Sequence, residues 1–204
     1  MENKLGGKIG KGKEYNSDNG KLIFEGDYLN GKRNGKGKEY YDNGKIKYEG
    51  EYLNGKKWNG KGYNYEGSFK FEIKNGKGKI KEYNNKDELI FEGEYLNGEI
   101  NGKGKEYNSY NGKLKFEGEY LNGKRCGKGK EYYDNGKIRY EGDYLNGQRN
   151  GKGKVYYKYA KKIFEDEYSN EKRNGKEKNY SDKNQLKYEG EYLNGKKWNG
   201  KGYN

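Results

Sequence analysis

The chain has 204 residues, with 45 lysines and arginines against 32 aspartates and glutamates, which gives a formal net charge of +13. Charged residues make up 38% of it and hydrophobic residues 28%, proportions that on their own are typical of a disordered chain. The absence of histidine removes the commonest acid–base group and metal ligand near neutral pH, and the single cysteine excludes an intramolecular disulfide.

An internal repeat argues against disorder. After a half-repeat over residues 6–23, copies of one unit follow each other in steps of 24, 17, 26, 25, 24, 24 and 24 residues. The copies begin at Phe24, Tyr48, Tyr65, Phe91, Phe116, Tyr140, Phe164 and Tyr188. A period of this length indicates a repeat architecture, so we expect one continuous repeat array over residues 1–204.

In the first full copy, residues 24–28 and 35–41 alternate large and charged residues, the pattern of strands with one wet face. Between them, residues 30–35 hold two Asn-Gly dipeptides and predict a loop. Asn43-Gly44 predicts a two-residue hairpin turn before a strand at 46–52. The fold class predicted is all-β: an elongated, twisted, single-layer antiparallel meander of about eight β-hairpin repeats, without helices.

These turns give a register and two faces. The predicted pairs are Tyr41–Ile46, Glu39–Tyr48, Lys38–Glu49, Tyr28–Gly37 and Asp27–Lys38. One face then carries cross-paired charges: Glu25, Asp27, Lys36, Lys38, Lys47, Glu49 and Glu51. The other carries Phe24, Tyr28, Tyr41, Ile46, Tyr48 and Tyr52, with Gly26, Gly37 and Gly50 between them. A tyrosine ring laid over a cross-strand glycine would cover exposed backbone and explain why glycine recurs inside strands, where it otherwise lowers stability.

The pattern Y/F-x-G-x-Y…N-G-K-x-x-G-x-G resembles the MORN repeat (membrane occupation and recognition nexus), from about Gly6 to Tyr203. The segment YYDNGKIKYEG resembles the variant form of that repeat. The chain departs from the family where a tyrosine replaces the usual tryptophan, at Tyr28, Tyr52, Tyr95, Tyr120, Tyr144 and Tyr192. The resemblance implies a scaffold or interaction module at membranes or cytoskeletal structures, often dimeric. It also implies a partner helix on the aromatic groove in some arrays, acidic phospholipids as ligands in others, and an accessory role beside lipid kinases or methyltransferases.

Two candidate binding surfaces follow. The aromatic face is predicted to meet a partner, because a single-layer sheet cannot bury its own apolar face and tyrosine suits interfaces. Its members are Phe24, Tyr28, Tyr41, Tyr48, Tyr52, Phe91, Tyr95, Phe116, Tyr120, Tyr133, Tyr140, Tyr144, Tyr188 and Tyr192. The loops form a basic edge that would attract anionic lipid headgroups. Its members are Lys32, Arg33, Lys56, Lys57, Trp58, Lys124, Arg125, Lys196, Lys197 and Trp198.

The sequence favours no catalytic, metal or cofactor site. Cys126 stands where other copies have asparagine and no histidine is present to activate it, and no Gly-Lys is followed by the Ser or Thr of a phosphate-binding loop. We therefore expect a non-enzymatic protein-interaction scaffold that uses the aromatic–glycine face to bind a helix or a second copy. Two alternatives are a peripheral module that binds acidic phospholipids and an accessory region of a larger enzyme such as a lipid kinase. Nucleic-acid backbone is a less favoured ligand. No secretory signal is seen, so the expected location is cytoplasmic, at a membrane or the cytoskeleton in the lipid-binding case.

Overall fold

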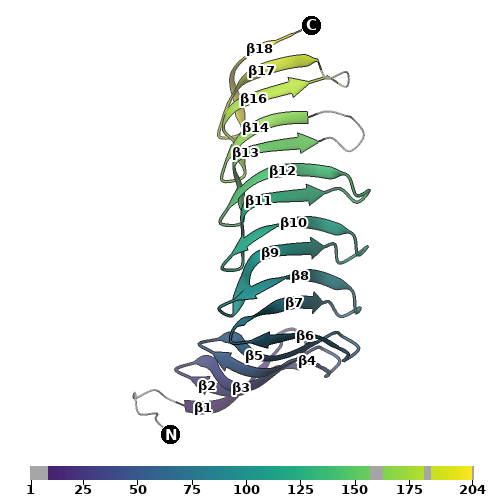
Figure 1. The fold of residues 1–204 in the computed structure, drawn as a ribbon, viewed down its shortest axis with the longest axis vertical. Helices are drawn as coiled ribbons and strands as arrows, with labels where there is room; N and C mark the ends of the chain where they lie inside the picture. The colour runs from purple at the N-terminus through teal and green to yellow at the C-terminus, as the bar shows by residue number, and fades with distance from the viewer. Residues whose placement is uncertain (1–8, 157–162, 182–184, 204) are drawn as a thin grey trace. The chain divides into compact units, whose positions relative to one another are not determined.

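The computed structural model describes residues 9–156, 163–181 and 185–203, and within them the chain forms eighteen strands and no helix (Figure 1). Residues 6–8, the start of the predicted half-repeat, lie outside this description. The strands are β1 (Ile9–Tyr15), β2 (Leu22–Leu29), β3 (Lys32–Tyr40), β4 (Ile46–Leu53), β5 (Lys56–Tyr63), β6 (Phe69–Lys74), β7 (Lys77–Tyr83), β8 (Leu89–Leu96), β9 (Glu99–Tyr107), β10 (Leu114–Leu121), β11 (Lys124–Tyr132), β12 (Ile138–Leu145), β13 (Gln148–Tyr156), β14 (Ile163–Ser169), β15 (Lys172–Arg173), β16 (Gly175–Tyr180), β17 (Leu186–Leu193) and β18 (Lys196–Gly202). They form an open antiparallel meander, so the predicted all-β class is confirmed.

The chain divides into two compact units. The first extends to Gly102 and takes in Ser109–Gly112, so it contains β1 to β8. The second comprises Lys103–Asn108 and the chain from Lys113 onward, so it contains β10 to β18, and the boundary falls inside β9. Within each unit, strands pair antiparallel with their neighbours in the sequence, and β14 pairs with both β15 and β16. One continuous array across both units stays a prediction.

The first turn of each repeat is shorter than predicted. Asn30 and Gly31 alone connect β2 to β3, and Leu29 pairs directly with Lys32. Both turn residues have positive φ (51° and 74°), the conformation of the hairpin turn for which Asn-Gly is best suited. The prediction of a loop over residues 30–35 is therefore wrong, because Lys32–Gly35 already belong to β3.

The second turn is longer than predicted. The backbone N–H of Tyr41 donates to Lys45 O at 2.9 Å and that of Gly44 donates to Tyr41 O at 3.0 Å, so the connection runs through residues 41–45. Ile46 faces Tyr40, which makes the predicted Tyr41–Ile46 pair wrong. The predicted pairs Glu39–Tyr48 and Lys38–Glu49 are confirmed.

The register between β2 and β3 also differs from the prediction. Gly26 faces Gly37 and Glu25 faces Lys38, so the predicted pairs Tyr28–Gly37 and Asp27–Lys38 are wrong. The reason is a bulge: Asp27 alone stands against residues 34–36 of β3, and its carboxylate accepts the backbone N–H of Lys36 at 3.0 Å. The short turn and the bulge together move the register by two residues, which leaves the two faces unchanged.

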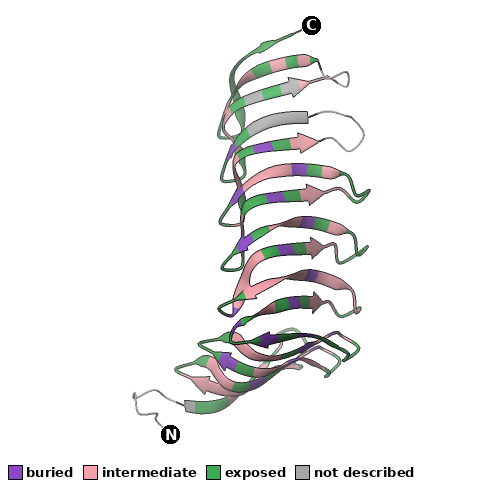
Figure 2. Cartoon of the chain, viewed as in Figure 1, coloured by how far each residue is buried: buried purple, intermediate pink, exposed green. Residues whose placement is uncertain are grey.

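One face of the sheet is the core. Buried positions recur along the strands between exposed ones (Figure 2). The side chains of Phe24, Tyr48, Phe116 and Tyr140 have no exposed surface. Rings two strands apart meet edge to face across the intervening strand, as Phe24 of β2 does with Tyr52 of β4 at 5.2 Å between centroids. Such pairs add about 1 kcal/mol beyond the burial of their area.

Candidate functional site

The structure buries most of the predicted aromatic face within the chain itself. The buried members are Phe24, Tyr41, Tyr48, Tyr52, Phe91, Phe116, Tyr120, Tyr140 and Tyr144. The half-buried members are Tyr28, Tyr95, Tyr133, Tyr188 and Tyr192. Only the second group presents ring surface to solvent. Binding of a partner on this face stays a prediction, and it would fall on those half-buried rings.

Glycines allow the rings to lie directly on the backbone. A Cβ atom added to Gly37 would lie 2.6 Å from Cζ of Phe24 and 3.1 Å from Cε2 of Tyr52. One added to Gly12 would lie 2.7 Å from Cε2 of Tyr28. The predicted packing of aromatic rings over strand glycines is therefore confirmed. It also explains how one layer of strands covers its own apolar face.

In several repeats the second residue after the Asn-Gly turn is an arginine that folds onto the aromatic face. The Cζ atom of Arg33 lies 3.9 Å from the centroid of the Phe24 ring, and its Nη2 and Nη1 atoms lie 2.7 and 2.8 Å from Glu14 and Glu39. Guanidinium groups suit this position because they stack on rings and bind carboxylates with two nitrogens.

The same arrangement recurs in the second unit. Arg125 lies over Phe116 at 3.9 Å, and its Nε donates to Glu106 at 2.8 Å. Arg149 lies 4.2 Å from the centroid of the Tyr140 ring and donates to Glu131. The repeated arginine is therefore a structural group that closes the edge of the aromatic core.

The predicted lipid-binding set thus separates into two groups. Lys57 behaves like the arginines, with Nζ 2.8 Å from Glu39 and 4.8 Å from the centroid of the Tyr48 ring. Arg33, Lys57 and Arg125 are held in these contacts, and Trp58 is half-buried. The exposed members are Lys32, Lys56, Lys124, Lys196, Lys197 and Trp198, of which Lys56 pairs with Glu99 at 2.9 Å and Lys197 lies over Tyr188 at 4.4 Å. Lipid binding by this edge stays a prediction.

These contacts shift the pKa values of the acids. The hydrogen bond from Arg33 lowers the pKa of Glu14 from 4.5 to about 2, against a smaller opposing effect of burial. Burial opposes ionisation of Glu39, but the ammonium of Lys57 and the guanidinium of Arg33 outweigh it and lower its pKa. Glu106 and Glu131 are shifted in the same direction by Arg125 and Arg149, again against burial. All four acids are therefore carboxylates at neutral pH.

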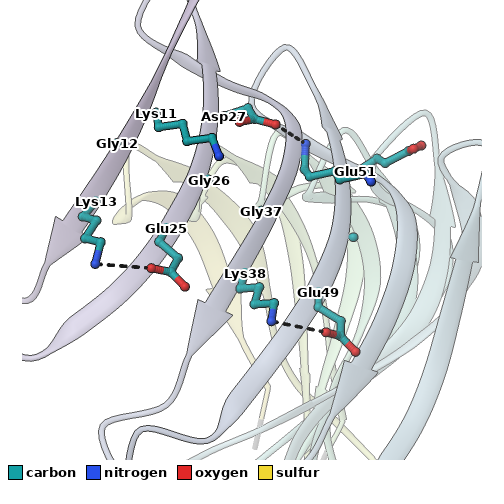
Figure 3. A pocket seen from close by; sticks show the side chains of 12 residues that line it. Lys11, Gly12, Lys13, Glu25, Gly26, Asp27, Gly37, Lys38, Glu49 and Glu51 are labelled. Carbon is teal, nitrogen blue, oxygen red and sulfur yellow. Dashed lines mark hydrogen bonds and ion pairs between the residues drawn. The ribbon is translucent and has the colours of Figure 1, made fainter.

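The opposite face carries paired charges, shown for β1 to β4 in Figure 3. Lys13 Nζ lies 3.5 Å from Glu25, and Lys38 Nζ lies 4.0 Å from Glu49, so bases and acids alternate from strand to strand. Two such rows flank a central row of glycines and enclose a groove of about 850 Å³. The predicted charged face is confirmed for Glu25, Asp27, Lys36, Lys38, Glu49 and Glu51. The placement of Lys47 on this face is wrong, because its ammonium lies 5.6 Å from the centroid of the Tyr41 ring and acts on Glu39 of the aromatic face.

The groove is neutral overall, because four lysines and four acids line it. The lining charges are Lys11, Lys13, Lys36, Lys38, Glu25, Asp27, Glu49 and Glu51. A surface of this kind attracts no ion strongly as a whole, but its alternating pattern discriminates between partners by charge complementarity.

Exposed leucines form a feature that the sequence prediction missed. Five strands, β4, β8, β10, β12 and β17, end in a leucine whose side chain is exposed. These leucines are Leu53, Leu96, Leu121, Leu145 and Leu193. Each precedes an Asn-Gly turn, so the leucines occupy equivalent places in successive repeats. The sequence did contain a signal for these leucines, because a leucine recurs before the Asn-Gly turn in successive repeats.

The arginine partners were also missed. The confirmed pair Glu39–Tyr48 already placed Glu39 opposite a core ring, and therefore on the aromatic face, where an acid requires a base. This inference was available from the sequence register alone.

The described residues contain no cluster of side chains suited to hold a metal ion. Burial raises the pKa of the Cys126 thiol, so at neutral pH it is protonated and a poor nucleophile. Within the same part of the chain, no helix has the length and apolarity needed to span a bilayer.

The MORN repeat family model matches residues 24–46, 48–62, 65–81, 91–111, 116–138, 140–158 and 188–202. The MORN repeat variant matches residues 173–194. Together these matches cover well over half of the chain. A search of the curated proteins found no match.

Proposed function

Since the chain belongs to the MORN repeat family, whose repeats are protein- and membrane-interaction modules, we propose that it is a non-catalytic scaffold that binds another protein. The observation that carries the proposal is the exposed charged face, where lysines and acids alternate across a rigid sheet and line a neutral groove. A neutral pattern of alternating charges favours a partner of complementary pattern over a uniformly anionic surface.

Two further observations support a protein partner over a membrane. Most of the aromatic rings are buried by the fold itself, whereas the charged groove is accessible. Three members of the basic edge, Arg33, Lys57 and Arg125, are held in contacts to acids. The charge available to attract lipid headgroups is correspondingly smaller than the sequence suggests.

A charge swap inside the groove tests the proposal. A photo-crosslinking residue in place of Lys38 would capture the partner, whose affinity for the purified chain is then measured by calorimetry. The double variant Lys36→Glu with Glu51→Lys keeps the cross-strand pair and the net charge but reverses the pattern that a partner meets. We expect the same melting temperature and at least about tenfold weaker binding, since each of the two reversed charges turns an attractive pair of up to about 1 kcal/mol with the partner into a repulsive one. Unchanged affinity in the swapped variant would contradict the proposal.

A second function has one observation in its favour. The exposed leucines lie next to turns that carry exposed lysines, as Leu121 does beside Lys124 and Leu193 beside Lys196. Apolar and basic residues side by side suit the headgroup region of an anionic membrane. If the chain acts there, replacing Leu121, Leu145 and Leu193 by serine will abolish vesicle binding without changing the melting temperature.

A further inference from the structure

A row of tyrosines crosses the charged face of the first unit. Strands β1, β3, β5 and β7 end in Tyr15, Tyr40, Tyr63 and Tyr83, which together are called the tyrosine row. Each follows the charged-face lysine of its strand by two residues, as Tyr40 follows Lys38, so the alternation along the strand places it on the same face. The tyrosine row belongs neither to the aromatic face nor to the basic edge.

Hydroxyl groups hold the rings of this row against the sheet. Tyr40 donates to Glu25 and Tyr63 donates to Glu49, both at 2.7 Å and both to an acid on the preceding strand. These two rings therefore lean across the face instead of projecting into solvent, and they are half-buried. Burial and the hydrogen bond to Glu25 raise the pKa of Tyr40 to about 12, so the hydroxyl keeps its proton at neutral pH. Rings that are already fixed lose little side-chain freedom when a ligand binds on them.

The spacing of the tyrosine row selects the conformation of a ligand. Its members stand on every second strand, which sets successive rings about 9.4–9.8 Å apart along the row. A polyproline II helix advances about 9.3 Å in each turn of three residues, so every third residue would meet a ring. An α-helix advances about 10.8 Å in two turns and an extended strand about 6.8 Å in two residues, so both lose register within the row.

The lysines beside the row favour an acidic ligand. The side chains of Lys13 and Lys38 are 56% and 47% exposed, more than those of the acids they contact. Glu25 is already engaged, because it accepts the hydroxyl of Tyr40 and lies 3.5 Å from Nζ of Lys13 (Figure 3). The lysines recur on every second strand as the tyrosines do. Acids at every third residue of the ligand would therefore meet them, and the net charge of +13 favours the approach of an acidic partner.

We propose that the tyrosine row is a docking site for a proline-rich, acidic segment of another protein, bound as a polyproline II helix that runs across the strands. A proline at every third position lies on a tyrosine ring. An acid at every third position pairs with a lysine of the same strands: Lys13, Lys38, Lys61 or Lys81. Polyproline II helices suit aromatic surfaces because they are preformed and lose little entropy on binding. This docking site rests on the scaffold function proposed above, because it presupposes a protein partner on the charged face.

The second unit carries the same arrangement. Strands β11 and β13 end in Tyr132 and Tyr156, which donate to Glu117 and Glu141, each at 2.6 Å. Each unit therefore offers its own site. A second copy of the chain is not the occupant of either, because the chain contains no proline.

Peptides of different period test the proposal. The probe is a fluorescein-labelled peptide of four Pro-Ala-Glu repeats, titrated with the intact protein and followed by fluorescence anisotropy. We expect saturable binding. A peptide of three Pro-Ala-Ala-Glu repeats has the same length, but its prolines no longer lie on one side of the polyproline II helix, and it should bind roughly tenfold more weakly. Four Pro-Ala-Lys repeats should lose at least as much, because every attractive charge pair becomes repulsive.

Removing a ring in each unit makes the test specific. Tyr40→Ser with Tyr132→Ser should weaken binding of the Pro-Ala-Glu peptide roughly tenfold or more, whereas Tyr40→Phe with Tyr132→Phe, which keeps the rings, should bind it normally. Tyr110→Ser is the matched control, because it removes a tyrosine that is 89% exposed and lies outside the row. Lys38→Glu with Lys130→Glu should shift the preference from the Pro-Ala-Glu to the Pro-Ala-Lys peptide, a gain that a folding defect cannot produce.

Three results would overturn the docking site: no binding, equal binding of the two periods, or binding that neither the serine nor the Lys→Glu variants change. The scaffold function would remain open to its own test in each case. That test exchanges Lys36 and Glu51, which lie on the opposite side of the glycine row from Lys38 and the tyrosines. Capture of a partner that responds to that exchange but does not compete with the Pro-Ala-Glu peptide would keep the scaffold function and reject the proline-rich ligand.

Discussion

The guanidinium of Arg33 lies 3.9 Å from the centroid of the Phe24 ring while its nitrogens contact Glu14 and Glu39. Its neighbour Lys32 is exposed in the turn. Two adjacent bases that look equivalent in the sequence therefore have different roles, one in the fold and one at the surface. The same difference recurs at Lys124 and Arg125. The basic edge therefore has less positive charge available for a ligand than the sequence suggests.

Removing the stacked arginine should destabilise the second unit much more than removing the adjacent lysine. Arg125→Ala leaves Glu106 without its base on the aromatic face, and we expect a loss of about 2 kcal/mol, below the 3–5 kcal/mol of a fully buried pair. Lys124→Ala should change stability by less than about 0.5 kcal/mol. Urea unfolding of both variants measures this difference, and equal stabilities would show that Arg125 is not a structural residue.

Filling the space under a ring should disrupt the first unit locally. Gly37→Val places a side chain where Phe24 and Tyr52 now lie, and overpacking of this kind costs about 1–3 kcal/mol. Gly10→Val is the matched control, because a Cβ atom on Gly10 meets nothing within 4 Å. Lys32→Ala is the second control. If Gly37→Val has the same melting temperature as the two controls, the packing of rings over glycines is wrong.

Stability should fall in acid through the ion pairs of the aromatic face. The folded pKa of Glu14 is about 2, below its ordinary 4.5, because Arg33 binds the carboxylate. The stabilisation is therefore complete above pH 4.5 and is lost as the pH falls towards 2. Thermal melts between pH 7 and pH 2 should show this loss, and Arg33→Ala should reduce the slope. A slope unchanged by Arg33→Ala would assign the acid sensitivity to other carboxylates.

The two tryptophans should report different surroundings despite identical flanking sequence. Trp198 is 72% exposed, whereas Trp58 is half-buried and its ring lies within 2.7 Å of the position of a Cβ atom on Gly76. With Trp58→Phe the remaining emission should be red-shifted and readily quenched by acrylamide, and with Trp198→Phe it should be blue-shifted and protected. Equal quenching in the two variants would contradict the exposure of β18.

Much of the fold could be predicted from the sequence, because the same alternation of large and charged residues and the same Asn-Gly turns recur in successive copies. The alternation in residues 24–28 and 35–41 gave the strands and the two faces, and the pair Lys38–Glu49 gave the correct register between β3 and β4. The turn lengths could not be predicted, because both connections contain Asn-Gly. What distinguishes them is the positive φ of both Asn30 and Gly31 and the bulge opposite Asp27, which depend on backbone geometry.

The candidate site was predicted less completely. The sequence identified the basic residues and the rings but not that Arg33 and Phe24 meet, because residues 30–35 were predicted to be a loop. In the structure Arg33 belongs to β3 and faces Tyr28, which places it on the aromatic face. Burial of the rings was also missed, since a single layer was expected to need a cover. Aromatic side chains on alternate strands supply that cover for each other, across the glycines of the strand between them.

Flotation of the purified chain with vesicles containing phosphoinositide or phosphatidic acid, at low and at physiological salt, tests the central claim most directly. A protein scaffold with a neutral groove and internally paired arginines should bind weakly at low salt and not at all at physiological salt, where surface charges are screened beyond about 8 Å. Binding that survives physiological salt, and that Lys124→Ala with Lys196→Ala abolishes, would contradict the account and identify the basic edge as a membrane site.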